Sequence, residues 1–184
     1  MTRNTLCLEN VNFLIVDPNT FMRSLIKNVL HVFGADKFIE ANDGADAFEA
    51  MQKLAPDIII TEWMMDPLDG LDFTRLVRTG KDSINPFVPI IMMTAYSELK
   101  RVVEARDTGI TEFIAKPLSA KTLMSRVTAV IEHPRPFIRS PRYFGPDRRR
   151  RESSDYKGPE RRKSVEDGEG ANLSQEEVEA LLDA

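Results

Sequence analysis

The apolar run Ile-Ile-Ile at residues 58–60 constrains the fold of this chain most, because it is too short for a helix. Pro56 precedes the run and polar residues follow it, so we expect a fully buried strand of a parallel sheet. Glu62 stands where that strand should end, before a loop with turn signals at 66–67 and 69–70. Ligands of α/β sheets lie outside the carboxyl ends of the strands. The pattern therefore places an acidic side chain at a candidate functional edge.

Short apolar runs alternate along the chain with segments whose apolar residues have helical spacing. We expect strands at 11–16, 38–41, 58–60, 90–93 and 113–115, and helices at about 20–33, 45–54, 71–78, 98–107 and 123–131. Such alternation implies a parallel sheet with helices on both faces. The predicted fold class is therefore α/β, with five βα units in a doubly wound parallel sheet.

Length and composition bound the rest of the molecule. A chain of 184 residues with 42% hydrophobic side chains can build one ordinary domain plus an extension. No apolar run approaches the length of a membrane span, and the N-terminus lacks the apolar stretch of a secretory signal. The single cysteine, Cys7, cannot form an internal disulfide. We therefore expect a cytoplasmic protein that binds no membrane.

Residues 56–70 have the spacing of the phosphoacceptor segment in bacterial response-regulator receiver domains, and the chain resembles CheY-like receivers over about residues 9–133. The resemblance implies a flavodoxin-like sheet with the strand order 2-1-3-4-5. In that order the tips of strands 1 and 3, which carry Asp17 and Glu62, flank the topological switch point. We expect a receiver domain over residues 1–133.

The resemblance also implies a phosphorylation site that is degenerate in this chain. In the family, two acids follow strand 1, an acceptor aspartate follows strand 3, a Thr or Ser follows strand 4 and a Lys follows strand 5. Asp17 matches the first acid, but Pro18 replaces the second, which binds Mg²⁺ in the family. Glu62 replaces the acceptor aspartate. Thr94 and Lys116 match the positions that neutralise the transferred phosphoryl oxygens.

Three further positions complete the implied site. Phe113 matches the aromatic switch position, and residues 116–117 match a Lys-Pro pair whose peptide bond is typically cis in the family. Met64 stands where a backbone carbonyl binds the metal. We expect a weak Mg²⁺ site at most, from Asp17, Glu62 and the Met64 carbonyl, with no other cofactor and no catalytic residue.

Glu62 has three interpretations. As a phosphoacceptor, its extra methylene would move the carboxylate by about 1.5 Å, out of line with the metal and Lys116. As a mimic of the phosphorylated state, it would reach both Lys116 and Thr94. As a purely structural residue, it would pair with Lys116 in a fold that serves only as a scaffold.

The stretch 134–170 is basic and contains a repeat. Residues 134–163 hold eleven Arg or Lys against four Asp or Glu, and the pattern Tyr-x-Gly-Pro-acid-Arg-Arg occurs at 143–149 and 156–162. Aliphatic residues are few, so we expect disorder. Arginine binds phosphates with a two-point fork and stacks on flat rings. The repeats are either a solvated linker or a clamp for a nucleotide second messenger, RNA or an acidic protein face, through Arg148, Arg149, Arg161 and Arg162.

The final stretch, 171–184, predicts an acidic amphipathic helix. Ser174 and Glu177 have the spacing of a capping box. Residues 173–182 resemble the N-terminal peptide of the flagellar switch protein FliM that binds CheY. The resemblance implies docking on the strand-4 to helix-5 face of a receiver, in this chain or another, near Tyr96, Arg101 and Lys121. The side chains expected to dock are Leu173, Val178, Leu181 and Leu182, and the alternative is a solvated acidic tail.

The sequence thus favours a signalling protein over an enzyme, because it contains no nucleophile–base pairing and no Gly-rich phosphate loop. The resemblance implies a single-domain response regulator of two-component, phosphorelay or chemotaxis signalling, without normal Asp phosphorylation. Its partners would be another receiver, a histidine kinase or a flagellar switch component, with no specific DNA. The alternatives are an anion-binding effector that uses the arginine repeats and a functional Mg²⁺-dependent phosphoacceptor.

Overall fold

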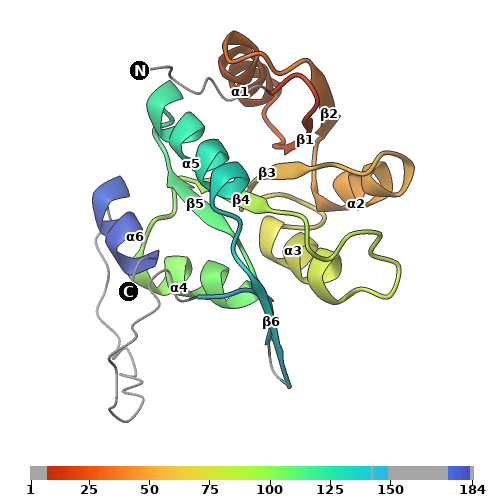
Figure 1. Cartoon of the computed structure of the whole chain (residues 1–184), viewed down its shortest axis with the longest axis vertical. Helices are drawn as coiled ribbons and strands as arrows, with labels where there is room; N and C mark the ends of the chain where they lie inside the picture. Colours follow the sequence, from red (N-terminus) through yellow and green to blue (C-terminus); the bar gives the residue numbers. More distant parts are fainter. Residues whose placement is uncertain (1–7, 142, 149–173, 183–184) are drawn as a thin grey trace.

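The computed structural model describes residues 8–141, 143–148 and 174–182. At its centre lies a five-stranded parallel sheet in the order β2-β1-β3-β4-β5 (Figure 1). The fold class and the strand order predicted from the sequence are confirmed. The strands are β1 (Asn12–Val16), β2 (Lys37–Ala41), β3 (Ile58–Glu62), β4 (Ile90–Thr94) and β5 (Glu112–Ala115).

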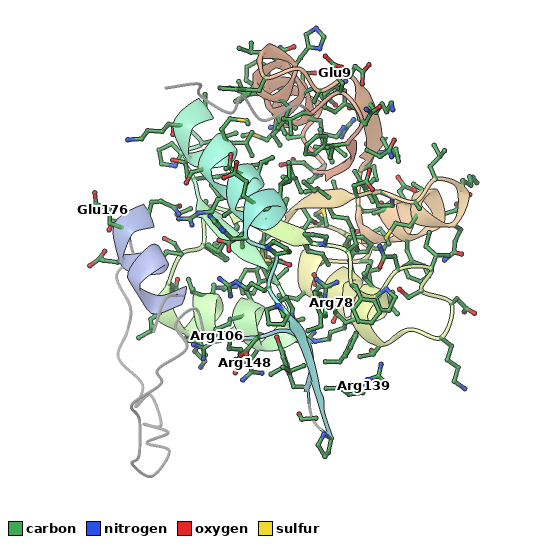
Figure 2. All side chains as sticks on the ribbon, in the orientation of Figure 1. Glu9, Arg78, Arg106, Arg139, Arg148 and Glu176 are labelled. Atoms are coloured by element: carbon green, nitrogen blue, oxygen red, sulfur yellow. The ribbon has the colours of Figure 1, made fainter. Side chains whose placement is uncertain are left out.

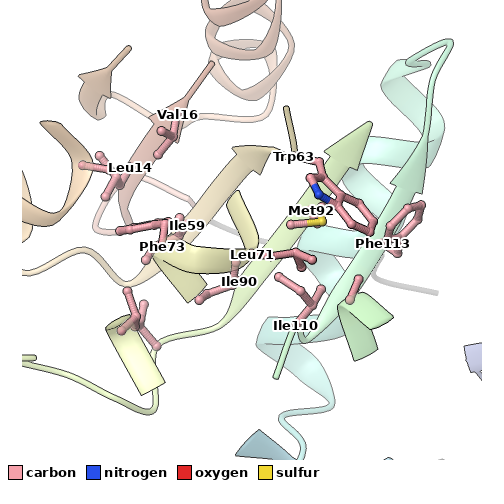
Figure 3. Close-up of a cluster of buried hydrophobic side chains, with 14 of the residues drawn as sticks. Leu14, Val16, Ile59, Trp63, Leu71, Phe73, Ile90, Met92, Ile110 and Phe113 are labelled. Atoms are coloured by element: carbon pink, nitrogen blue, oxygen red, sulfur yellow. The ribbon is translucent and has the colours of Figure 1, made fainter. Parts of the chain in front are cut away.

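Helices cover both faces of the sheet, and the side chains of each strand alternate between them. Ile58 and Ile60 pack with residues of the first and last of the five helices that flank the sheet, whereas Ile59 packs with residues of the three helices between them. Figure 3 shows part of the cluster around Ile59, with Leu14 and Phe113 among its members. Burial on both faces explains why the strands are continuous apolar runs in the sequence. The helices are α1 (Thr20–Val32), α2 (Gly44–Lys53), α3 (Gly70–Thr79), α4 (Leu99–Thr108) and α5 (Ala120–Glu132).

Capping side chains fix where most of these helices begin. The Asn19 side chain accepts hydrogen bonds from the first backbone N–H groups of α1, and Asp43, Asp69 and Ser119 do the same for α2, α3 and α5. Such caps satisfy N–H groups that have no partner inside the helix. The caps of α1, α2 and α5 lie within four residues of the strands that precede them, so they also fix the short connections at these strand tips.

The expectation of disorder directly after residue 133 is wrong for residues 137–140 and 143–146, which pair as two antiparallel strands of a hairpin. Its strands are β6 (Phe137–Ser140) and β7 (Tyr143–Pro146). The rings of Phe137 and Phe144 pack against Phe87, with centroids 5.2 and 5.4 Å away. The hairpin therefore belongs to the folded domain. The rest of the segment expected to be disordered, residues 149–170, lies outside the described part of the chain.

A buried arginine joins the hairpin to the sheet. Arg78 donates to the carbonyl oxygens of Gly109 (3.0 Å), Pro86 (2.8 Å) and Val88 (2.7 Å), in the loops that lead into β5 and β4. Its guanidinium lies 5.1 Å from the centre of the Phe137 ring, and Figure 2 shows its place beside the hairpin. Burial lowers the pKa of Arg78 to about 9, because the charged form has lost its hydration.

Near the end of the chain, α6 (Gln175–Leu182) lies where the sequence analysis expected a helix, and it runs beside α4 and β5 (Figure 1). Leu173, one of the residues expected to dock, lies outside the described residues. Among the helices that the structure describes, none has the length and apolar character needed to span a membrane.

Candidate functional site

Four polar side chains meet at the carboxyl edge of the sheet. Asp17 follows β1, Glu62 and Thr94 end β3 and β4, and Lys116 follows β5. The strands are parallel and in register, so their tips end at one edge of the sheet. The arrangement places the four residues where the sequence analysis expected a degenerate phosphorylation site. The Lys116–Pro117 peptide is cis.

Glu62 is held in place through both of its carboxylate oxygens. Oε2 contacts the ammonium of Lys116, and Oε1 accepts a 2.6 Å hydrogen bond from the backbone N–H of Trp63. The Met64 N–H approaches the same oxygen at 3.4 Å. Glu62 is 8% exposed, so the ion pair is largely shielded from water. Shielding strengthens the attraction of the pair and makes the loss of either partner costly.

Asp17 is the second carboxylate at this edge and is more deeply buried, at 2% exposure. Its Oδ2 lies 3.4 Å from Lys116 Nζ, and its Oδ1 accepts a 2.7 Å bond from the Asn19 N–H. Burial raises the pKa of Asp17, and the bond from Asn19 and the charge of Lys116 only partly oppose this effect. The Lys116 ammonium therefore lies against two carboxylates, those of Asp17 and Glu62.

Thr94 and Phe113 are both buried, but the Thr94 hydroxyl does not bind Glu62 in the way that it would bind a phosphoryl oxygen. The Thr94 hydroxyl accepts a bond from the Tyr96 N–H at 3.3 Å. Phe113 packs in the cluster that contains Trp63 and Met92 (Figure 3). The interpretation of Glu62 as a phosphorylation mimic required contacts with both Lys116 and Thr94. Glu62 makes the contact with Lys116, whereas the Thr94 hydroxyl bonds to the backbone of the following loop.

The residues at this edge do not fit a resident Mg²⁺, a cation that requires oxygen ligands in octahedral array. The Lys116 ammonium already lies against the Asp17 and Glu62 carboxylates and supplies the positive charge. Pro18 offers no carboxylate. A weak site from Asp17, Glu62 and the Met64 carbonyl would require the contacts of Lys116 to break.

The loop after Glu62 is tightly closed. The Gly70 N–H donates to the Trp63 carbonyl at 2.8 Å. A Cβ at position 70 would lie 2.2 Å from the Glu62 carbonyl oxygen, so only glycine permits this approach. Trp63 is 3% exposed and anchors the loop in the core. The guanidinium of Arg101 lies 5.4 Å from the Trp63 ring centre and 5.0 Å from that of Tyr96, a stack that links the site to α4 and that the sequence analysis missed.

Comparison with known proteins agrees with this geometry. A profile of the response regulator receiver domain matches residues 13–128. The chain belongs to the response regulator receiver family. The receiver is 31% identical to the chemotaxis protein CheY-3 of Vibrio cholerae over 124 residues, which are 67% of this chain and 94% of that protein. It is also 31% identical to the chemotaxis protein CheY of Pseudomonas aeruginosa over 122 residues, 66% of this chain and 97% of that one.

Solved structures give the same picture. Vibrio cholerae CheY4 superposes with a TM-score of 0.59 at 28% identity, over 65% of this chain and 98% of that one. The CheY of Borrelia burgdorferi, solved with CheX, BeF3 and Mg²⁺, also gives 0.59, at 24% identity over 66% and 89% of the two chains. The latter shows the fold alone. The hairpin β6–β7 and α6 lie beyond the residues that the receiver profile matches.

In this receiver, α6 lies against the edge of the sheet. The Gln175 side-chain amide accepts a 2.7 Å bond from the Ala115 N–H and donates a 3.4 Å bond to the Phe113 carbonyl. Val178 is fully buried in the cluster that includes Phe113. Val178 was expected to dock, but Gln175 was not, although it stands in the first turn of the expected helix. The side chains of Leu181 and Leu182 lie outside the described part of the structure.

Of the four arginines expected to clamp an anion, only Arg148 lies within the described residues. One of its terminal nitrogens is 3.0 Å from a carboxylate oxygen of Asp107, and its guanidinium lies 4.0 Å from the centre of the Tyr143 ring. Figure 2 labels it next to Arg106, in the lower half of the view. Arg148 would therefore have to leave a carboxylate before it could bind another anion. Arg149, Arg161 and Arg162 lie outside the described residues.

Proposed function

We propose that this receiver signals by docking to other proteins and does not use phosphorylation at the acceptor position. The observation that carries the proposal is the ion pair between Glu62 and Lys116. In the family the lysine neutralises a transferred phosphoryl group. Here the lysine already contacts two carboxylates, Glu62 and Asp17.

Local geometry supports a fixed role for Glu62. A side chain one methylene longer than aspartate places its carboxylate about 1.5 Å farther from the strand. That reach brings one oxygen to Lys116 while the other accepts the Trp63 N–H at 2.6 Å. Nucleophilic attack on a phosphodonor would require Glu62 to leave both partners. Because Pro18 stands where the family has a metal-binding acid, no second carboxylate would help to hold Mg²⁺ during such a step.

The comparisons support a role in two-component or chemotaxis signalling. The similar proteins from Vibrio cholerae and Pseudomonas aeruginosa are named chemotaxis proteins. One similar CheY was solved in a complex with another protein, CheX. We propose that this chain also acts by binding signalling proteins, and that its partner is a receiver, a histidine kinase or a flagellar switch component.

Phosphorylation chemistry tests the proposal directly. The full chain is incubated with acetyl phosphate and low-millimolar Mg²⁺, and its intact mass and its fluorescence are measured. Trp63 is the only tryptophan and adjoins Glu62, so its emission reports on the site. We expect no phosphoryl adduct and no quenching by Mg²⁺. A phosphoryl group on Glu62, or strong quenching by Mg²⁺, would overturn the proposal.

Two variants separate the effects of Glu62 and Pro18. Glu62→Asp restores the family's acceptor but not the second acid, so it should bind Mg²⁺ poorly and accept little phosphate. Glu62→Asp with Pro18→Asp should gain both properties together. If Glu62→Asp alone gave normal Mg²⁺-dependent phosphorylation, the role assigned to Pro18 would be wrong.

A further inference from the structure

A cavity of about 420 Å³ lies where the hairpin covers the C-terminal turns of α3 and α4. These turns are at the opposite edge of the sheet from Glu62, because each helix runs back from the strand tips. Tyr143 and Phe144 of β7 form the third wall. That wall lies beyond the residues that the receiver profile matches, so the cavity is a feature of this chain's extension.

The hairpin wall is tightly built. The Tyr143 hydroxyl donates to the Pro146 carbonyl at 2.7 Å. A Cβ at position 145 would lie 2.6 Å from the Tyr143 hydroxyl and 3.0 Å from the Gly109 Cα, so only glycine permits this approach. The ring of Phe144 packs against Phe87 on its other side. The wall is therefore held in shape by the domain itself.

Arg78 places a buried positive charge in the α3 wall (Figure 2). The residue is 3% exposed, and its Nε and Nη1 donate only to neutral backbone carbonyls. Its Nη2 is buried and has no hydrogen-bond partner among the described residues. Buried charges in proteins are normally paired. The Arg78 guanidinium therefore has both a donor and a charge to offer to an anion.

The side chains around the cavity do not balance this charge. Burial raises the pKa of Tyr143, so its phenol stays neutral at pH 7. Asp107 lies 3.0 Å from Arg148 and 3.3 Å from Arg106, and Glu104 lies 3.7 Å from Arg75. Both carboxylates of the cavity thus pair with other arginines, and Arg78 is left without a counter-ion among the described residues.

We infer that this cavity binds a small organic monocarboxylate, with its carboxylate on Arg78 and its apolar part against Phe144. Charge-assisted bonds between guanidinium and carboxylate groups are among the stronger hydrogen bonds in proteins. Glu104 and Asp107 line the same cavity and would repel a dianion such as phosphate more than a monoanion. The volume falls in the range of small-molecule sites, roughly 300–1,000 Å³. This binding function goes beyond protein docking and involves neither Glu62 nor α6.

Nuclear magnetic resonance of the ¹⁵N-labelled full chain tests the inference. Sodium acetate and sodium benzoate are titrated separately at pH 7 and constant ionic strength, and the Nε–H signal of Arg78 and the amides of Thr108 and Tyr143 are followed. We expect shifts that saturate in the millimolar range, with benzoate tighter than acetate because its ring buries apolar surface. Benzamide, the neutral molecule of the same shape, should leave the Arg78 signal unchanged. Inorganic phosphate should bind at least about 10-fold more weakly than benzoate.

A variant of the cavity wall locates the site without removing Arg78. Thr108→Leu adds bulk at the α4 wall, and Thr108 makes no bond to Arg78, because its hydroxyl donates to the Glu104 carbonyl. We expect it to weaken benzoate binding at least about 10-fold. Thr128→Leu is the matched control on α5, outside the cavity, and should bind benzoate like the wild type.

Each other outcome contradicts the inference. If neither carboxylate gave saturating shifts, the cavity would not be a binding site for this class of ligand. Equal shifts of the Arg78 signal with benzamide would rule out recognition of the carboxylate. Unchanged benzoate affinity in Thr108→Leu would place the ligand elsewhere on the protein. None of these measurements involves phosphorylation or a protein partner, so the proposed docking function is tested separately.

Discussion

Replacing Lys116 with methionine should destabilise the receiver strongly, because it removes the one positive charge shared by two buried carboxylates. Breaking a buried pair by removing one partner typically costs about 3–5 kcal/mol. The Lys116 side chain keeps 20% exposure, so water can reach part of the site. We therefore expect a loss of about 2–3 kcal/mol in the free energy of unfolding at pH 7.

The loss should depend on pH in a known direction. The pKa of Asp17 is already raised above its ordinary value of 3.8, mainly by burial. Without Lys116 it should rise further, because the lysine charge lowers it. The folded state then holds more protons than the unfolded state between the two values, so stability increases as the pH falls through that window. The cost of Lys116→Met should shrink as the pH falls from 7 toward 3.8.

Urea denaturation followed by circular dichroism measures these free energies by linear extrapolation. Lys53→Met is the matched control, because Lys53 pairs with Glu49 on the surface of α2, with both side chains 70% exposed. Its cost should stay within about 0.5 kcal/mol. Adding Glu62→Gln to Lys116→Met should recover about 1 kcal/mol or more, since one of the two unpaired carboxylate charges disappears. If Lys116→Met cost no more than Lys53→Met, the buried pair would not hold the site together.

Two other changes test neighbouring parts of the structure. Asp17→Asn removes a charge that burial disfavours and keeps an oxygen that can accept from the Asn19 N–H. In urea denaturation, the stability of this variant relative to wild type should therefore be higher at pH 8 than at pH 4. The same difference at both pH values would contradict this reasoning. Phe137→Ala should cost about 1–3 kcal/mol, because it removes a ring from the hairpin cluster, whereas Ile138→Ala at a more exposed position should cost about 0.5 kcal/mol or less. Equal costs would show that the Phe137 ring contributes no more to stability than the more exposed Ile138 side chain.

The sheet and its helices could be predicted from the sequence because local signals and burial agree. Runs such as residues 58–60 are apolar throughout because both faces of the sheet are covered, and Asn19 marks a helix start by its own chemistry. The strand order has no local signal, since it depends on which strands pair across the chain. It came from the resemblance to receivers.

The hairpin β6–β7 was missed because its composition resembles that of a disordered segment. Prolines, glycines and arginines dominate the stretch, and only a few aromatic residues can bury surface. Those rings gain order from Phe87, a loop residue about fifty positions earlier, and from the guanidinium of Arg78. A composition argument cannot foresee a partner that lies so far away in the sequence.

The contacts of the site could be predicted where the residue types alone determine which side chains pair. A glutamate at the tip of β3 and a lysine after β5 were expected to pair in two of the three interpretations of Glu62, and they do. The position of the Thr94 hydroxyl, by contrast, depends on the backbone of the next loop, where its oxygen accepts a bond from the Tyr96 N–H. The Gln175 contact also depends on a backbone edge that is visible only once the strand order is known.

The proposed role of Glu62 bears on what can act as a switch in this receiver. A phosphorylated receiver changes state when a phosphoryl group is added or removed at the strand tips. Under the proposed function, Glu62 stays with Lys116 and the Trp63 N–H, and phosphorylation at the tips does not select between states. Ala115, which the Gln175 amide contacts, directly precedes Lys116, so α6 closes the same strand that ends at the ion pair.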